Sequence, residues 1–394
     1  MAWLVPENKL DPQQREFLDN VDIEHENRWI EGFAGSGKSV LLAYTARRVL
    51  SRNHSAKIIV IVFTRSLVEM FKAAFNELGL SVKVDTYYGF MGSSEKYDYI
   101  LCDEIQDLPD KVLREMKNRG AHIVVAGDSN QSIYEKDPKW REPTVSASAI
   151  NGLMGSTSFK LNIIHRLSKS IIKAISEFMP RMDIFSAKTD MTHADTQIRL
   201  CEAKSEREEV AYIMKVAKKA VKVGESVAIL IPTGRAILDF ADMALEAEGK
   251  MEWSEQTNCW GKIDFGSLNC HFQSVGLDMQ YVGNSYGDFI DNGGKITIMT
   301  FHSSKGLDFD NVFIPFANSS MFISSNESLA KTLFMVAMTR ARKNLYISYC
   351  GYMSDYLDSF KSDCAHIDIS SQMASTSLSN NKNNSSAAGS IFGF

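Results

Sequence analysis

Eight consecutive residues, Gly32-Phe33-Ala34-Gly35-Ser36-Gly37-Lys38-Ser39, have the types and spacing of a loop that holds nucleotide phosphates. They fit the pattern G-x-x-x-x-G-K-[ST], in which backbone N–H groups of a glycine-rich turn surround the phosphates. Lys38 would reach the β- and γ-phosphates, and the hydroxyl of Ser39 could hold Mg²⁺. A helix beginning here would add the positive end of its dipole. The stretch therefore predicts a nucleotide site.

Two adjacent carboxylates, Asp103 and Glu104, follow an apolar run at residues 97–102. In an open α/β sheet the carboxyl end of a strand faces the ligand crevice. Asp103 could there hold Mg²⁺, and Glu104 could act as general base on an attacking water. The alternative is a solvated acidic turn before a helix, which this pair alone would favour. The phosphate-binding pattern in the same chain favours the catalytic interpretation.

The elements that must position these residues are short Ile- and Val-rich runs alternating with amphipathic stretches. The first series has expected strands at 28–33, 57–63, 97–102 and 122–126 and expected helices at 38–52, 66–78 and 109–119. The second has strands at 197–201, 227–231, 295–300, 311–315 and 344–349 and helices at 206–221, 236–248 and 327–342. This alternation is typical of a parallel sheet covered by helices on both faces.

We therefore predict an α/β protein with two parallel-sheet domains, at residues 1–155 and 156–369. Residues 251–294 have weak periodicity and are expected to form a short irregular insertion in the second domain. Residues 370–394 are Ser/Asn-rich and nearly uncharged, which predicts a disordered tail.

Bulk composition narrows the class of protein. The chain has 394 residues, 44% of them hydrophobic and 23% charged, and a net charge of −5, so no global basic field attracts nucleic acid. Its six cysteines are scattered without a C-x-x-C pair, which favours reduced thiols in a cytoplasmic protein over a metal site at Cys259, Cys270 and His271. The apolar runs are too short to cross a membrane.

Eight segments, one of which contains Asp103 and Glu104, follow one another along the chain. They are 10–16 (LDPQQRE), 63–66 (FTRS), 85–90 (DTYYGF), 103–107 (DEIQD), 127–134 (GDSNQSIY), 161–168 (LNIIHRLS), 300–309 (TFHSSKGLDF) and 336–342 (VAMTRAR). Together they resemble the motifs of the UvrD/Rep/PcrA group of superfamily 1 DNA helicases. The resemblance implies two RecA-like P-loop NTPase domains with ATP and Mg²⁺ in the cleft between them.

The resemblance also implies roles for single residues. Gln14 would read the adenine, Gln131 would sense the γ-phosphate, and Asp308 stands where the family usually has Glu. Arg166 and Arg340, both in the expected second domain, would reach across the cleft; an arginine arriving in this way can raise turnover by ~10³–10⁵ and makes hydrolysis depend on domain closure. The candidate nucleotide-site residues are Gln14, Gly32, Phe33, Ala34, Gly35, Ser36, Gly37, Lys38, Ser39, Val40, Asp103, Glu104, Gln131, Arg166, Asp308 and Arg340.

A second set of residues lies in or beside the segments that resemble strand-contact motifs. It consists of Phe63, Thr64, Arg65, Tyr87, Tyr88, Phe90, Trp140, Thr300 and His302. Aromatic rings stack on bases of any identity, and Arg or Thr side chains can hold phosphates. For any single aromatic, packing in the core is the better interpretation; only their recurrence beside motor motifs favours a groove for a single strand.

Three departures from the family pattern stand out. After Tyr134 the chain reads Glu-Lys-Asp-Pro-Lys-Trp-Arg, so acidic residues or lysine occupy positions expected to be basic and aromatic; Trp140 or Arg141 could substitute. The large insertions of both motor domains have no room here, which predicts a nearly bare motor that unwinds duplex poorly. Val40 replaces a residue that is often basic in the relatives.

The leading hypothesis is an ATP-dependent 3′→5′ DNA helicase or translocase, acting on single-stranded DNA in repair or replication. RNA is left open as the track, because stacking and phosphate contacts serve both polymers. The alternative is a nucleotide-sensing ATPase subunit of a nuclease-linked defence or repair complex. It would bind its partner through the apolar tail tip at residues 391–394.

Overall fold

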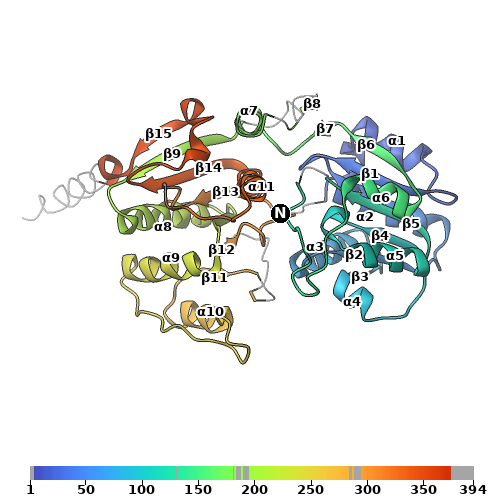
Figure 1. Cartoon of the computed structure of the whole chain (residues 1–394), viewed down its shortest axis with the longest axis horizontal. Helices are drawn as coiled ribbons and strands as arrows, with labels where there is room; N and C mark the ends of the chain where they lie inside the picture. Colours follow the sequence, from blue (N-terminus) through green and yellow to red (C-terminus); the bar gives the residue numbers. More distant parts are fainter. Residues whose placement is uncertain are drawn as a thin grey trace, which may run out of the picture. The chain divides into compact units, whose positions relative to one another are not determined.

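The computed structural model describes residues 4–128, 131–180, 182, 188–189, 195–283, 286–287 and 294–373. It divides the chain into two compact units. Unit 1 comprises Met1–Ala194, Lys305–Leu307 and Asn326–Thr339; unit 2 comprises Asp195–Ser304, Asp308–Ser325 and Arg340–Phe394. Each unit is built on a parallel sheet (Figure 1), which confirms the predicted α/β fold.

Unit 1 contains a six-stranded sheet in the order β3-β2-β4-β5-β1-β6, and every neighbouring pair in it is parallel. Its strands are β1 Asn27–Gly32, β2 Ile58–Val62, β3 Lys83–Thr86, β4 Tyr97–Cys102, β5 Gly120–Gly127 and β6 Ser156–Leu161. A separate two-stranded pair consists of β7 Ile163–Ile164 and β8 Lys188–Thr189. The helices are α1 Pro12–Asn20, α2 Lys38–Arg52, α3 Arg65–Glu77, α4 Tyr87–Met91, α5 Asp110–Arg119, α6 Ala147–Met154, α7 Lys169–Phe178 and α11 Glu327–Met338, with 3₁₀ turns η1 Glu7–Lys9 and η2 Ile105–Asp107.

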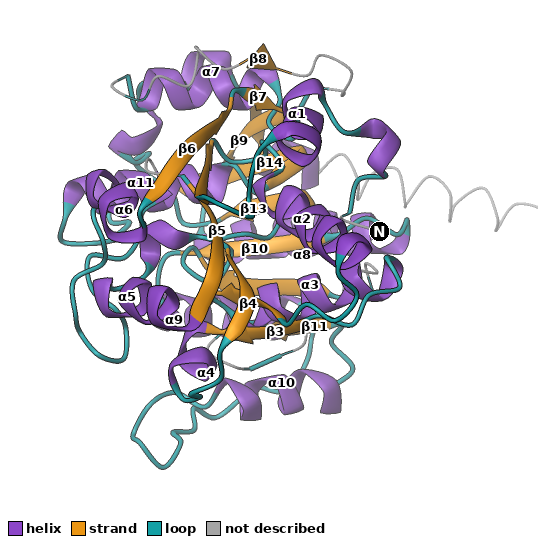
Figure 2. Cartoon of the chain, turned by 90° about the vertical axis from the view of Figure 1, so that its right-hand side faces the viewer, coloured by secondary structure: helices purple, strands orange, loops and turns teal. Residues whose placement is uncertain are grey.

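Two hydrophobic clusters cover the two faces of this sheet. Strand β2 is buried along its whole length; Ile58, Val60 and Val62 join one cluster and Ile59 and Ile61 the other, because successive side chains of a strand point to opposite faces. Helices α1, α2 and α3 supply side chains to the first cluster, and α4, α5 and α6 to the second. Figure 2 shows these helix layers on opposite sides of the unit 1 strands.

Unit 2 contains a seven-stranded parallel sheet in the order β11-β12-β10-β13-β14-β9-β15. Its strands are β9 Gln197–Ala203, β10 Val227–Ile231, β11 Met279–Tyr281, β12 Ile296–Thr300, β13 Phe309–Ile314, β14 Ala341–Cys350 and β15 Ala365–Asp368. Its helices are α8 Glu206–Lys222, α9 Gly234–Ala247 and α10 Phe265–Ser274, and its 3₁₀ turns are η5 Asp355–Leu357 and η6 Lys361–Asp363. Side chains of α8, α9 and α10 enter one core cluster with β10, β11 and β12.

The structure changes the expected domain limits. Strand β6 begins after the predicted boundary at residue 155, yet it pairs with β1 along all six of its residues, so unit 1 continues to residue 194. Residues 305–307 and 326–339 also pack with unit 1, so the second unit is not one continuous segment from 156 to 369.

The structure also corrects, in part, the predicted irregular insertion and the predicted disordered tail. The region 251–294 contains helix α10 and strand β11, and Leu268 and Phe272 of α10 are fully buried in the core. Residues 369–373 are helical, and Ile369 is fully buried, so the ordered part extends past the predicted tail start at residue 370. Residues 374–394, including the apolar tail tip, lie outside the described residues.

Two classes of feature are missing from the described part of the chain. It holds no helix long and apolar enough to cross a bilayer. All six cysteines are free, and the described residues contain no cluster of three or more His, Cys, Asp or Glu suited to a metal.

Candidate nucleotide-binding site

The predicted phosphate loop joins the end of β1 to the start of α2. Gly35 and Gly37 have φ of 76° and 85°, in the left-handed region that favours glycine, and Gly37 is the residue that precedes the helix. The ammonium group of Lys38 donates to the carbonyls of Gly32 at 2.8 Å and Phe33 at 3.0 Å. The lysine is therefore held against the loop that would surround the phosphates.

Ser39 and Asp103 meet, although they come from different elements. The Ser39 hydroxyl at the start of α2 donates to Asp103 Oδ2 at 2.5 Å, and Asp103 directly follows β4. Burial, together with the charge of Glu104, raises the pKa of Asp103 to about 6. A hydroxyl and a carboxylate are oxygen donors of the kind that Mg²⁺ prefers, so this pair fits the predicted metal role.

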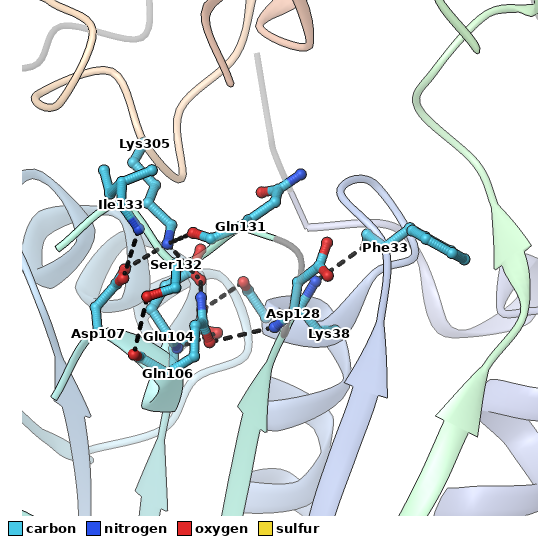
Figure 3. Close-up of polar contacts among 12 residues, drawn as sticks. Phe33, Lys38, Glu104, Gln106, Asp107, Asp128, Gln131, Ser132, Ile133 and Lys305 are labelled. Carbon is cyan, nitrogen blue, oxygen red and sulfur yellow. Dashed lines mark hydrogen bonds and ion pairs between the residues drawn. The ribbon is translucent and has the colours of Figure 1, made fainter. Parts of the chain in front are cut away.

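Glu104 and Gln106 connect the carboxylate segment with the segment that begins at Gly127. Glu104 has φ of 54°, and its Oε2 accepts from Gln106 Nε2 at 2.6 Å. Gln106 Oε1 in turn accepts from the main-chain N–H of Asp128 at 3.2 Å. Gln106 is buried, and its side chain joins the two segments through these hydrogen bonds (Figure 3).

Lys305 lies among these carboxylates. Its ammonium group contacts Asp107 Oδ2, donates to the carbonyl of Gln131 at 2.5 Å and lies 3.5 Å from Glu104 Oε2 (Figure 3). Burial raises the pKa of Asp107 to about 6 even though Lys305 opposes the rise. Burial alone would lower the pKa of Lys305, but the charges of Asp107 and Glu104 raise it. The group is a buried ion cluster beside the phosphate loop.

Gln106, Asp107 and Lys305 are not among the residues that the sequence predicts for the site. Each lies inside a segment that the sequence did mark, 103–107 or 300–309. Their position inside these segments is the signal in the sequence that points to them. The contacts that join the two segments appear only in the folded structure. Gln131, which is among the predicted residues, contributes its main-chain carbonyl to this cluster.

Gln14 lies beside the phosphate loop. Asp11 and Gln14 form a reciprocal cap at the start of α1, where the N–H of Asp11 donates to Gln14 Oε1 at 3.1 Å. Gln14 Nε2 also donates to the carbonyl of Ser36 at 3.1 Å. This contact ties α1 to the loop; the adenine contact of Gln14 stays a prediction.

Arg166 reaches the loop from unit 1 and not from a second domain, which corrects the sequence expectation. The N–H of His165 donates to the carbonyl of Gly35 at 2.9 Å, and His165 Nε2 lies 2.5 Å from Asp11 Oδ2. A Cβ added at Gly35 would lie 2.6 Å from Cβ of Arg166. The segment after β6 therefore covers the phosphate loop within one unit.

The remaining nucleotide-site candidates are placed differently. Arg340 and Asp308 belong to unit 2, where the N–H of Phe309 donates to the carbonyl of Arg340 at 2.9 Å and Arg342 Nη1 lies 3.3 Å from Asp308 Oδ1. The side chain of Val40 is buried in the core cluster, so only its main chain is left for nucleotide contact. Of the loop residues, Ala34 and Ser36 are buried and Phe33 is half-buried.

Two of the predicted strand-contact aromatics belong to the core. Tyr87 and Phe90 of α4 are 0% and 1% exposed, and both lie in the cluster under β2 and β4. For these two residues packing in the core, and not contact with a strand, is the correct interpretation. Phe63 is half-buried and stacks on Tyr87 and on Tyr134, with ring centroids 5.1 and 4.5 Å apart.

The polar members of that set have local roles in the structure. Thr64 caps α3 by accepting from the N–H of Leu67 at 3.3 Å, and Arg65 beside it is exposed. In unit 2, the hydroxyl of Thr300 donates to Ser303 Oγ at 2.9 Å, and His302 is half-buried. Tyr88 and Trp140 are half-buried and meet edge to face, 4.8 Å between centroids.

Comparison with known families adds to this geometry. Residues 277–352 match the model of the UvrD-like helicase C-terminal domain, and residues 14–137 match that of an AAA domain. In these two segments the chain is similar to a UvrD-like helicase C-terminal domain and to an AAA domain. The match at 14–137 includes the phosphate loop and the carboxylates, and the match at 277–352 includes Lys305 and Arg340.

Individual relatives of this chain are helicases by name. It is 40% identical over 67 residues to a DNA helicase II of Rickettsia typhi, a match covering 14% of this chain and 10% of the relative. It is 40% identical over 62 residues to the ATP-dependent DNA helicase Rep of Buchnera aphidicola subsp. Schizaphis graminum, covering 14% and 9%. The matches thus span about a tenth of the length of these relatives.

A solved structure is also similar. It is the complex of Arterivirus nonstructural protein 10, a helicase, with DNA, at 13% identity and a TM-score of 0.44; the similarity covers 85% of this chain and 63% of that one.

Proposed function

We propose that this chain is an ATP-driven motor that hydrolyses ATP while moving on single-stranded DNA. The contact of Ser39 with Asp103, 2.5 Å between oxygens, carries the proposal, because it joins the phosphate loop to the carboxylates. The UvrD-like and AAA matches, and the helicase names of the relatives, support the same activity.

Each residue of the site has a proposed role. Lys38 would move from the carbonyls of Gly32 and Phe33 to the phosphate oxygens, and Glu104 would orient the attacking water and accept its proton. Mg²⁺, held by Ser39 and Asp103, would neutralise charge on the β- and γ-phosphates. Arg166, from unit 1, would add positive charge beside the loop.

The parts supplied by the rest of the chain are also proposals. We assign Gln131 to sensing the γ-phosphate, Arg340 of unit 2 to the transferring phosphoryl group, and Asp308 to the nucleotide. Movement in the 3′→5′ direction rests on the resemblance to the UvrD/Rep/PcrA group. The buried state of Tyr87 and Phe90 leaves Phe63, Tyr88 and Trp140 as the aromatic candidates for strand contact in unit 1.

Two observations favour a second candidate function. The segment after Tyr134 lacks the basic and aromatic order of the family, and two expected strand-contact aromatics are buried. A nucleotide-sensing subunit of a larger defence or repair complex would need ATP binding and hydrolysis without movement on a strand.

Binding of nucleic acids tests the strand preference. We expect the chain to bind labelled oligo(dT) more tightly than a duplex of equal length, with a log–log salt slope of about −0.7 per neutralised phosphate. Fluorescence anisotropy at several salt concentrations measures this, with an RNA oligomer of the same length beside it. Tighter binding to the RNA oligomer would indicate that RNA, and not DNA, is the track. If the chain binds none of these polymers in a salt-sensitive way, the result would favour the nucleotide-sensing subunit.

A further inference from the structure

The segment that departs from the family pattern, residues 135–142, forms a closed loop. Lys136 and Pro143 form an antiparallel bridge. The N–H of Asp137 donates to the carbonyl of Glu142 at 2.7 Å, and the N–H of Thr144 donates to the carbonyl of Glu135 at 3.2 Å. The loop therefore has a defined shape.

A single buried carboxylate organises this loop. Asp137 is fully buried, and its Oδ1 accepts from the N–H of Lys139 at 2.9 Å and of Trp140 at 2.5 Å. Its Oδ2 accepts from the hydroxyls of Tyr87 at 2.6 Å and Tyr88 at 3.0 Å. One side chain thus fastens the loop to helix α4.

The two tyrosines are firm donors in this arrangement. Burial raises the pKa of Tyr88 to about 12 and raises the pKa of Tyr87 further, so both keep their hydroxyl protons at neutral pH. These two hydroxyls and the N–H groups of Lys139 and Trp140 together donate four hydrogen bonds to the buried carboxyl group of Asp137, as a buried polar group requires.

The fastened loop presents half-buried rings with cations on them. Lys111 Nζ of α5, which also pairs with Glu142 Oε1 at 2.7 Å, lies 3.6 Å from the ring centroid of Trp140, and Lys139 Nζ lies 5.1 Å from that of Tyr88. Lys136, Lys139 and Arg141 are exposed. Stacking rings beside positive charge are what proteins use to bind a single strand without sequence preference.

Backbone strain occurs at the same place. Arg141 has φ of 61°, a conformation that non-glycine residues seldom adopt, and its N–H donates to the carbonyl of Asp137 at 2.9 Å. The hydrogen bonds around Asp137 hold the loop in this conformation, so loss of the carboxylate should release both Arg141 and Trp140.

We propose that Asp137 is the positioning residue of a single-strand contact made by Trp140 and the basic side chains of this loop. The inference rests on the proposed function and deepens it. An aspartate on a surface that binds a polyanion would repel it if exposed. Buried and fully hydrogen-bonded, this aspartate instead fixes the shape of a loop whose exposed charges are mostly positive.

The variant Asp137→Asn tests the proposal against simple electrostatics. Asparagine keeps one acceptor oxygen but replaces the other with a donor, so the tyrosine hydroxyls and the loop N–H groups cannot all be satisfied. We expect about ten-fold weaker binding of oligo(dT), comparable to loss of one stacked base. The concentration of strand that half-saturates ATP hydrolysis should rise, while hydrolysis without strand stays within about two-fold of the parent.

Glu135→Gln is the matched control. Glu135 is exposed in the same loop and contacts Asn326 Nδ2, so this change removes the same charge without touching the anchor. Electrostatics alone would make both variants bind DNA more tightly. We expect Glu135→Gln to bind no more weakly than the parent, and Asp137→Asn to bind more weakly.

A double-mutant cycle completes the test. If Asp137 acts through the loop, Asp137→Asn added to Trp140→Ala should weaken binding little beyond Trp140→Ala alone. Additive losses, or parent-like binding by a folded Asp137→Asn, would overturn the inference. If Asp137→Asn does not fold, Tyr88→Phe removes one donor and keeps the ring; parent-like binding by that variant would equally overturn it. A parent chain that binds no oligo(dT) would instead refute the proposed function.

Discussion

Replacing Glu104 with Gln should reduce ATP hydrolysis by about 10²–10⁴-fold and leave ATP binding within a few-fold of the parent, because a general base contributes about that factor. Glutamine keeps the size of the side chain, and its carboxamide oxygen can still accept from Gln106 Nε2, so the link to Asp128 survives. Phosphate release under saturating ATP measures turnover, and a fluorescent ATP analogue measures binding.

The same change at Glu115, a half-buried residue of α5, is the control and should leave both quantities unchanged. Near-normal turnover in Glu104→Gln would show that another group activates the water. Loss of nucleotide binding in that variant would show instead that Glu104 holds the nucleotide or its metal.

Replacing Lys305 with Met should destabilise unit 1 by about 3–5 kcal/mol, because removing one partner of a buried ion pair leaves the other charge uncompensated. Lys305 is 4% exposed and Asp107 is 0% exposed, so water cannot take over the contact. Denaturant unfolding at pH 8 measures the loss of free energy.

The loss should depend on pH in a stated direction. Asp107 already has its pKa raised to about 6 by burial, and loss of Lys305 would raise it further. A carboxyl whose pKa in the folded protein exceeds that in the unfolded chain loses its stabilising contribution as pH rises through the folded value. The deficit of Lys305→Met should therefore shrink toward pH 5, where Asp107 is protonated.

Two further variants sharpen this prediction. Lys305→Arg keeps the charge and should lose less, and adding Asp107→Asn to Lys305→Met should restore much of the stability, because no buried charge then remains in the pair. A Lys305→Met variant as stable as the parent at pH 8 would contradict the ion cluster.

The phosphate loop and the carboxylates could be placed from sequence because each lies at the junction of a strand and its following segment. The run of apolar residues in β2 and β4, and the glycines before Lys38, are local signals. The end of a parallel strand then predicts which residues face the ligand.

The unit to which Arg166 belongs could not be predicted in this way. Strand β6 reads Ser-Thr-Ser-Phe-Lys-Leu. Because β6 lies at the edge of the sheet, Leu161 is the one buried residue within it. Without a buried apolar run β6 gives no strand signal, so the sequence predicts the domain boundary before it and places Arg166 in the second domain instead of unit 1.

Contacts between segments that are distant in the sequence could not be predicted either. Lys305 and Asp107 are almost two hundred positions apart, and nothing in the segment around Lys305 shows that it packs with unit 1. Asp137 appeared as a departure that weakened the strand contact, because a sequence does not show that the carboxylate is buried under Tyr87 and Tyr88.

The most direct test of the motor hypothesis is the rate of ATP hydrolysis by the unaltered chain with and without oligo(dT). We expect a low rate for the chain alone and a saturable rise of at least about ten-fold with the strand, because bound strand and bound ATP must stabilise the same state of the protein. A rate that does not change at saturating oligo(dT), in a protein shown to bind both ATP and the strand, would contradict the motor hypothesis.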